Sequence, residues 1–263
     1  GLPPAIEEGP TLREVVWGVS SDEVVERFAA KLKDLPGYVN AEGRVGCTDP
    51  NGLAVRFQKT RKIDLKLDTP GMNTWNEKAR RNQPGPIYER ATPIEVGHVV
   101  FFVKDVKACE KFYAENFGFV ASDRYPNRGA FMRCSAEGGH HDLFLLQPPQ
   151  PRSGLNHVAF TVRDIHEVFG GGMAMARQGW STQLGPGRHP ISSAYFWYFN
   201  FPGGGLIEYY ADEDYLDAEW EAREFEPGPT VFAEWAIEGG LDGHTRRQKN
   251  AKAPDGKFLT EKR

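Results

Sequence analysis

The chain has 263 residues, of which 40% are hydrophobic and 12% aromatic, and its formal net charge is −4 with an isoelectric point near 6.0. This composition is that of a globular protein large enough to bury one or two cores, and its acidic net charge does not indicate nucleic acid binding. No apolar run approaches the roughly 20 residues of a membrane helix, and neither end carries a basic segment followed by an apolar core, so we expect a cytoplasmic protein without nucleic acid or membrane partners.

Residues 1–60 are predicted to form a small βαβββ module. Residues 12–19 have the apolar and β-branched composition of a strand, and residues 22–32 have that of a helix that begins after Ser20 or Ser21. The chain begins with glycine rather than methionine, so we expect that an N-terminal part of this domain is missing or reduced.

The end of this module resembles a later segment of the chain. Residues 49–57 (DPNGLAVRF) parallel residues 201–209 (FPGGGLIEY), and the shared proline places Arg56 where the later copy has Glu208. The first strand of the module also contains no histidine. We therefore expect residues 1–60 to contribute packing and to bind no metal.

Residues 61–93 are predicted to be a linker. They are rich in lysine, arginine, asparagine, proline and glycine, and prolines at 70, 84, 86 and 93 interrupt any regular element.

A repeat follows the linker. Residues 98–106 (HVVFFVKDV) reappear 59 positions later as residues 157–165 (HVAFTVRDI). Each copy predicts a strand that begins with the histidine and ends at an aspartate able to cap the next helix. The helices are predicted over 106–117 and 165–178, each ending near a glycine.

Several short strands are predicted after each helix, including 129–134, 141–146 and 193–199. The fold class is therefore α+β, with repeated βαβββ modules, and two modules over 94–212 are expected to pair into one cupped sheet. Residues 213–263 are predicted to be a C-terminal arm and tail, within which 215–223 have helical composition.

Three residues in the paired modules have the chemistry of one metal site. His98 and His157 occupy the same place in the two copies, and Glu208 lies in an otherwise apolar closing strand. A carboxylate there is costly to bury unless it is paired or bound to a metal. Two imidazoles and one carboxylate form the facial triad that holds Fe(II) and leaves positions open for substrate and O₂.

The pattern around these residues resembles the C-terminal catalytic domain of type I extradiol dioxygenases, within the vicinal oxygen chelate superfamily. The resemblance covers about residues 94–212 and rests on GLN before His157, on GRH at 187–189 and on the segment from Tyr198 to LIEYY at 206–210. The sequence departs from the family at Phe201 and in the glycines that follow, and it shows three modules where relatives usually have four.

The resemblance also implies three catalytic residues. In the family a tyrosine precedes the ligand glutamate by ten residues, as Tyr198 does here, and a histidine precedes that tyrosine by nine, as His189 does. A further histidine, followed by aspartate, lies before the second ligand histidine. His141 fits that place, with His140 as its rival.

The resemblance implies an extradiol dioxygenase: a small aromatic diol of the catechol type chelates Fe(II), with Mn(II) as the alternative, and O₂ is the co-substrate that opens the ring beside the diol. Tyr198 and His189 would handle the substrate proton and His141 would act on the O₂ side. The alternatives are a glyoxalase-like isomerase or hydroquinone dioxygenase, and a metal-free small-molecule binding protein of the same fold. A homo-oligomer is expected.

Overall fold

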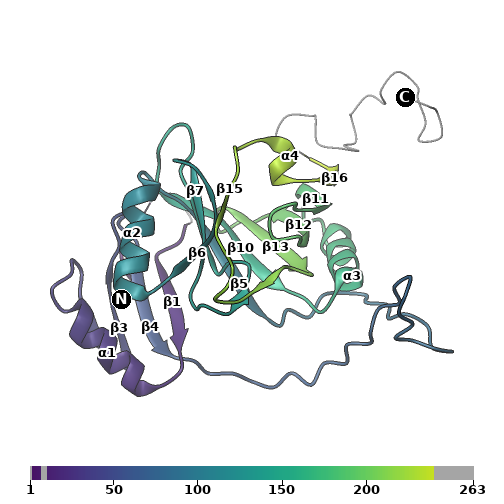
Figure 1. The fold of residues 1–263 in the computed structure, drawn as a ribbon, viewed down its shortest axis with the longest axis horizontal. Coiled ribbons are helices and arrows are strands. Elements are labelled where there is room, and N and C mark those ends of the chain that lie inside the picture. Colours follow the sequence, from purple (N-terminus) through teal and green to yellow (C-terminus); the bar gives the residue numbers. More distant parts are fainter. Residues whose placement is uncertain (1, 7–10, 240–263) are drawn as a thin grey trace.

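The computed structural model describes residues 2–6 and 11–239, and within them the same βαβββ unit occurs three times (Figure 1). The first unit consists of β1 (Glu14–Val19), α1 (Asp22–Leu32), β2 (Val39–Ala41), β3 (Arg44–Thr48) and β4 (Ala54–Lys59). The second consists of β5 (Glu95–Phe102), α2 (Val106–Phe117), β6 (Val120–Tyr125), β7 (Gly129–Arg133), the short β8 (Gly138–Gly139) and β9 (Leu143–Leu146). The third consists of β10 (Gly154–Thr161), α3 (Ile165–Arg177), β11 (Thr182–Arg188), β12 (Tyr195–Asn200) and β13 (Leu206–Ala211).

The three units share one topology. In each, the first and last strands are parallel neighbours, and the middle strands extend the sheet by antiparallel pairing. The first strands of the second and third units, β5 and β10, pair antiparallel and join both units into one ten-stranded sheet, whereas β1 to β4 form a separate sheet. This confirms the predicted α+β fold of repeated modules with the two histidine-bearing modules paired.

The helices after the histidine-bearing strands begin as predicted. The side chain of Asp105 accepts a hydrogen bond from the backbone N–H of Ala108 at 3.0 Å, and Asp164 accepts one from Glu167 at 2.9 Å. Gly118 then ends α2 in the left-handed conformation, with φ of 80°, which a residue with a Cβ rarely adopts.

The N-terminal unit packs on the second unit through α2. The ring of Phe117 in α2 lies 4.8 Å from that of Phe57 in β4, and Phe57 stacks on Phe28 of α1 at 4.1 Å. Buried residues of both units, such as Val55 and Leu145, belong to one apolar core. The division into a module at 1–60, a linker, a catalytic domain at 94–212 and an arm stays a prediction.

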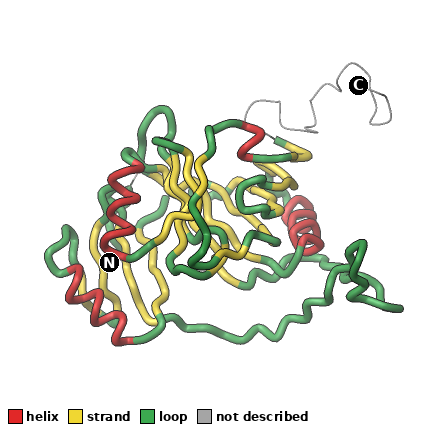
Figure 2. The backbone as a smooth tube through the Cα atoms, viewed as in Figure 1, coloured by secondary structure: helices red, strands yellow, loops and turns green. Residues whose placement is uncertain are grey.

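The connection between the first and second units is a long loop that runs along one side of the molecule (Figure 2). None of the helices in the described ranges combines the length and apolar character that crossing a bilayer requires.

The prediction of helix over 215–223 is wrong. Tyr215–Leu216 forms β14, which pairs with β8, and Arg223–Glu224 forms β15, which pairs with β6 at one edge of the large sheet. α4 (Pro229–Phe232) and β16 (Trp235–Glu238) follow, and β16 pairs with β11 at the other edge. The helical propensity of residues 215–223 is overridden by tertiary pairing, because this segment can pair with the edges of β8 and β6 only when its backbone is extended. Residues 240–263 of the predicted tail lie outside the described residues.

Candidate metal centre

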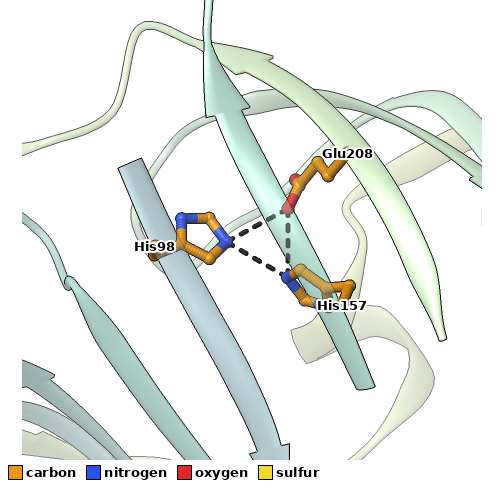
Figure 3. A group of neighbouring side chains, drawn as sticks. All are labelled: His98, His157 and Glu208. Carbon is orange, nitrogen blue, oxygen red and sulfur yellow. Dashed lines mark hydrogen bonds and ion pairs between the residues drawn. The ribbon is translucent and has the colours of Figure 1, made fainter. Parts of the chain in front are cut away.

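The three predicted ligands meet at the seam between the paired units. The Nε2 atoms of His98 and His157 are 3.1 Å apart, and each is 3.1 Å from Oε2 of Glu208 (Figure 3). All three side chains are buried. The sequence predicted that the histidines open their strands, and this is wrong: each is the fourth residue of its strand, because two of the three residues before it pair with the neighbouring strand and the third lies at an irregularity of the register.

Strand register explains how the site forms. His98 of β5 is paired with Ala159 of β10, and Ala159 is paired with Glu208 of β13, so the three lie in a row across the sheet. Paired residues of neighbouring strands project from the same face. His157 lies two residues before Ala159 and projects from that face too. Ala159 is fully buried in this row, and its side chain is a single methyl group.

The protonation states suit a metal. Burial raises the pKa of the Glu208 carboxyl, but the neighbouring imidazoles of His157, His189 and His98 outweigh it and hold that pKa well below its usual range. Burial lowers the pKa of His157 despite its contact with Glu208. A charged carboxylate and neutral imidazoles are the forms that ligate metals.

The donor set also fits a divalent cation. Without one, the two Nε2 atoms face each other and one of them must carry a proton, whereas a cation would be coordinated by both lone pairs and by Glu208 together. His157 is held behind the site by a 2.6 Å hydrogen bond between its Nδ1 and Asn156 Oδ1. His98 differs, because its buried Nδ1 has no hydrogen-bond partner among the described residues.

Tyr198 and His189 lie beside Glu208. Tyr198 of β12 is the cross-strand partner of Glu208 in β13, so the ten-residue spacing is the span of one hairpin. The Nδ1–H of His189 donates to the carbonyl of Phe232 at 2.7 Å, which leaves its Nε2 to accept from the Tyr198 hydroxyl at 3.1 Å. Burial and then Glu208 raise the pKa of Tyr198 well above its usual range, so the phenol stays protonated.

The structure places His141, not His140, at the cavity wall. The ring of His141 lies 4.2 Å from that of His98, and His141 borders the cavity. His140 is completely buried behind it and bonds to Asp123. Burial, together with His98 and His140, lowers the pKa of His141 well below its usual range.

The ligands and these three residues line one cavity of about 540 Å³, a volume typical of small-molecule sites. Its remaining wall is largely apolar and includes Val100, Phe131, Phe144, Leu146, Ile191 and Leu206. The C-terminal arm covers part of it with Val231 and Phe232.

Sequence reasoning missed some contributors. The carbonyl of Phe232 that orients His189 comes from α4, which was not predicted. Glu213 borders the cavity and accepts hydrogen bonds from the Tyr210 hydroxyl and the His140 backbone N–H, both at 3.0 Å. Neither the Phe232 carbonyl nor Glu213 can be recognised from the sequence pattern, because the position of each depends on how the C-terminal arm folds back over the cavity. Ala159 could have been found from its place between bulky strand residues.

Comparisons with known proteins agree with this arrangement. Residues 95–209 match the family described as Glyoxalase/Bleomycin resistance protein/Dioxygenase superfamily. Metapyrocatechase 2 of Cupriavidus necator is 31% identical over 209 residues, which are 77% of this chain and 63% of that protein. The chain thus spans less than two thirds of this relative.

A manganese-dependent 2,3-dihydroxybiphenyl 1,2-dioxygenase from Geobacillus genomosp. 3 is 23% identical over 81% of this chain and 73% of that protein. Among solved structures, the Mn(II)-bound glyoxalase from Novosphingobium aromaticivorans has a TM-score of 0.66 at 21% identity, covering 95% of this chain and 78% of the other. That likeness shows the fold.

Proposed function

We propose that the protein is an extradiol dioxygenase that cleaves a catechol-type ring beside the diol, and the match of residues 95–209 to the family described as Glyoxalase/Bleomycin resistance protein/Dioxygenase superfamily supports this proposal. The observation that carries the proposal is the combined site: three metal-ligand atoms within 4.8 Å of one another, with Tyr198, His189 and His141 around the same cavity. The 31% identity to metapyrocatechase 2 supports it.

His98, His157 and Glu208 would hold the metal, which we propose is Fe(II), with Mn(II) as the alternative that the manganese-dependent relative supports. When bound, the ion would lower the pKa of the substrate hydroxyls and bring O₂ beside the catechol, which is the source of the electrons that O₂ takes up. Two imidazoles and one carboxylate would leave the other coordination positions free for the substrate and O₂.

Tyr198 and His189 would receive the substrate proton. Because the phenol stays protonated, Tyr198 is not itself the base; its hydroxyl donates to Nε2 of His189 at 3.1 Å. A proton from a substrate hydroxyl can pass to the Tyr198 oxygen as the phenol proton moves to His189. The ring of Phe196, stacked on His189 at 4.0 Å, holds the imidazole in this position.

His141 would act on the O₂ side. It lies against His98 on the cavity wall, and its low pKa keeps it neutral until a reaction step delivers a proton to it. The apolar wall limits the entry of competing water.

The test is to mix anaerobically prepared, Fe(II)-loaded protein with catechols in air and to follow the yellow ring-opened product. Glu208→Gln is the matched control, because it keeps the side-chain volume and removes the charged ligand. Product from the wild type, none from the variant and one iron or manganese per active chain support the proposal. An active protein that contains zinc or no metal would contradict it, as would isomerase activity towards a thiohemiacetal without ring cleavage.

We further propose that the protein works in the cytoplasm as a homo-oligomer. Cys47, Cys109 and Cys134 are all unpaired, as is usual in a reducing compartment. The loop between the first and second units exposes Trp75 and Ile87 almost completely, at 94% and 92%, and such side chains favour burial against a second copy. Sedimentation of the wild type and of Trp75→Ser would measure the oligomeric state, and a monomeric wild type would contradict the proposal.

A further inference from the structure

A chain of hydrogen bonds runs from the C-terminal arm to His141. Arg223 donates to the Asp123 carboxylate from Nη2 at 2.7 Å, from Nε at 3.1 Å and from its backbone N–H at 2.9 Å. The same carboxylate lies 2.9 Å from Nε2 of His140, and Nδ1 of His140 lies 3.1 Å from Nδ1 of His141. Asp123 and His140 have no exposed surface.

The chemistry of these groups determines which nitrogen carries each proton. A carboxylate only accepts, so Nε2 of His140 must be the protonated nitrogen facing Asp123. In neutral His140 this leaves a lone pair on Nδ1. The opposing Nδ1 of His141 must then carry the proton that bridges the two rings. Nε2 of His141 is left with its lone pair available to the cavity.

Arg223 supplies the charge that balances Asp123. With the guanidinium bonded to it, the carboxylate has its cationic partner without a second one in this buried site. Its hydrogen bonds also keep Asp123 ionised: burial raises the pKa of that carboxyl, but His140 and Arg223 lower it below its usual range. Arg223 is itself held between the rings of Trp220 and Phe225, at 4.6 and 5.1 Å.

We propose that Asp123 and His140, fixed by Arg223 of the C-terminal arm, are positioning residues that hold His141 in the Nδ1–H tautomer with Nε2 turned to the cavity. The arm is then part of the catalytic apparatus and not only a cover. The catalytic consequence rests on the proposed function, whereas the tautomer follows from the hydrogen bonds of Asp123 with neutral His140 and of His140 with His141.

Asp123→Asn gives a specific test because it should reverse the direction of the hydrogen bonds that link residue 123, His140 and His141. The amide has one oxygen and one NH₂ group. The Oδ1 position accepts from two donors of Arg223, its backbone N–H and Nε, whereas the Oδ2 position accepts from only one, Nη2, so the oxygen is expected at the first position and the hydrogen bond from Nη2 is lost. The NH₂ group then faces His140 and donates to its Nε2. His140 becomes the Nδ1–H tautomer, and His141 is driven to Nε2–H.

The measurement is long-range ¹H–¹⁵N correlation spectroscopy on the full chain with ¹⁵N-labelled histidine and no added metal. We expect Nδ1–H for His141 in the wild type and Nε2–H in Asp123→Asn. Asp49→Asn is the control, because Asp49 is another buried carboxylate, bonded to Tyr113 at 3.1 Å in the N-terminal unit; it should leave both tautomers unchanged. Nε2–H in the wild type, or no change in Asp123→Asn, would overturn the proposal.

Kinetics separate this inference from the proposed function. In Asp123→Asn we expect anaerobic catechol binding to stay within a few fold while the O₂-dependent step slows by roughly 10 to 100-fold, the usual effect of removing a partner that orients a site imidazole. Arg223→Lys keeps the charge, so it should slow the O₂-dependent step less than Arg223→Gln does. A wild type that cleaves no catechol refutes the function. A wild type that cleaves catechol while Asp123→Asn does so at the same rate refutes the positioning role.

Discussion

Ala159→Leu tests whether the open space between the ligands is the metal site. Ala159 lies in the row between His98 and Glu208 and is fully buried, so three added carbons enter the volume that an ion would occupy. Overpacking of this kind costs about 1–3 kcal/mol. For a chain of this size that lowers the melting temperature by roughly 2–12 °C. The variant should also lose metal, since the ligand atoms can no longer converge on one point.

The assay is thermal unfolding with and without Fe(II) under anaerobic conditions. At a metal concentration of about 100 times Kd, binding stabilises the wild type by about 2.7 kcal/mol, or roughly 5–11 °C. Ala159→Leu should show no metal-dependent shift. Ala130→Leu is the matched control: Ala130 is equally buried but belongs to the core on the helix side of the sheet, so it should lose stability yet keep the shift. A full shift in Ala159→Leu would refute the reasoning.

Four further outcomes are expected. His141→Phe should bind metal and catechol anaerobically but slow turnover by roughly 10²–10⁴-fold in stopped-flow mixing with O₂; a wild-type rate would move that role to another histidine. Tyr198→Phe removes the link to His189, so the acidic limb of the kcat/KM profile should move to higher pH, and an unchanged profile would rule out this proton route. The pKa of Glu167 is held low because hydrogen bonds from Arg163 outweigh its burial. The charged carboxylate therefore stabilises the fold above the unfolded pKa of about 4.3, and this stabilisation is lost as pH falls through the folded value. In urea unfolding, Glu167→Gln should be less stable than the wild type at pH 7, and its free energy of unfolding should fall less at acidic pH. Arg56→Ala should keep one metal per chain by elemental analysis, and an ion bound within the first unit would contradict the expectation that this unit holds none.

Repetition made the fold and the ligand trio predictable. A histidine on one strand carries little information, but His98 and His157 recur in equivalent segments, and equivalent segments form equivalent strands that pair across a pseudo-twofold seam. The Tyr198 spacing was equally informative, because a hairpin fixes register and places residues ten apart opposite each other.

Long-range placement could not be predicted. The sequence favoured His141 over His140 only through the aspartate that follows it; the placement itself depends on Asp123, which bonds to the ring of His140 behind the cavity wall. The arm was misjudged for the same reason: the helical composition of 215–223 is outweighed by pairing with two distant strands and by the Arg223 contact with Asp123. Local propensity is a weak preference, and buried polar groups that need partners override it.

The most direct test of the central claim is isotope labelling. Fe(II)-loaded protein and a catechol are mixed under ¹⁸O₂, and the ring-opened product is analysed by mass spectrometry after rapid quenching. An extradiol dioxygenase places both atoms of one O₂ molecule in the product, apart from later exchange of the aldehyde or ketone oxygen with water, which a parallel reaction in H₂¹⁸O measures. Incorporation of both atoms is the predicted result. A ring-opened product whose new oxygens come from water, or a single labelled atom after correction for exchange, would contradict the account.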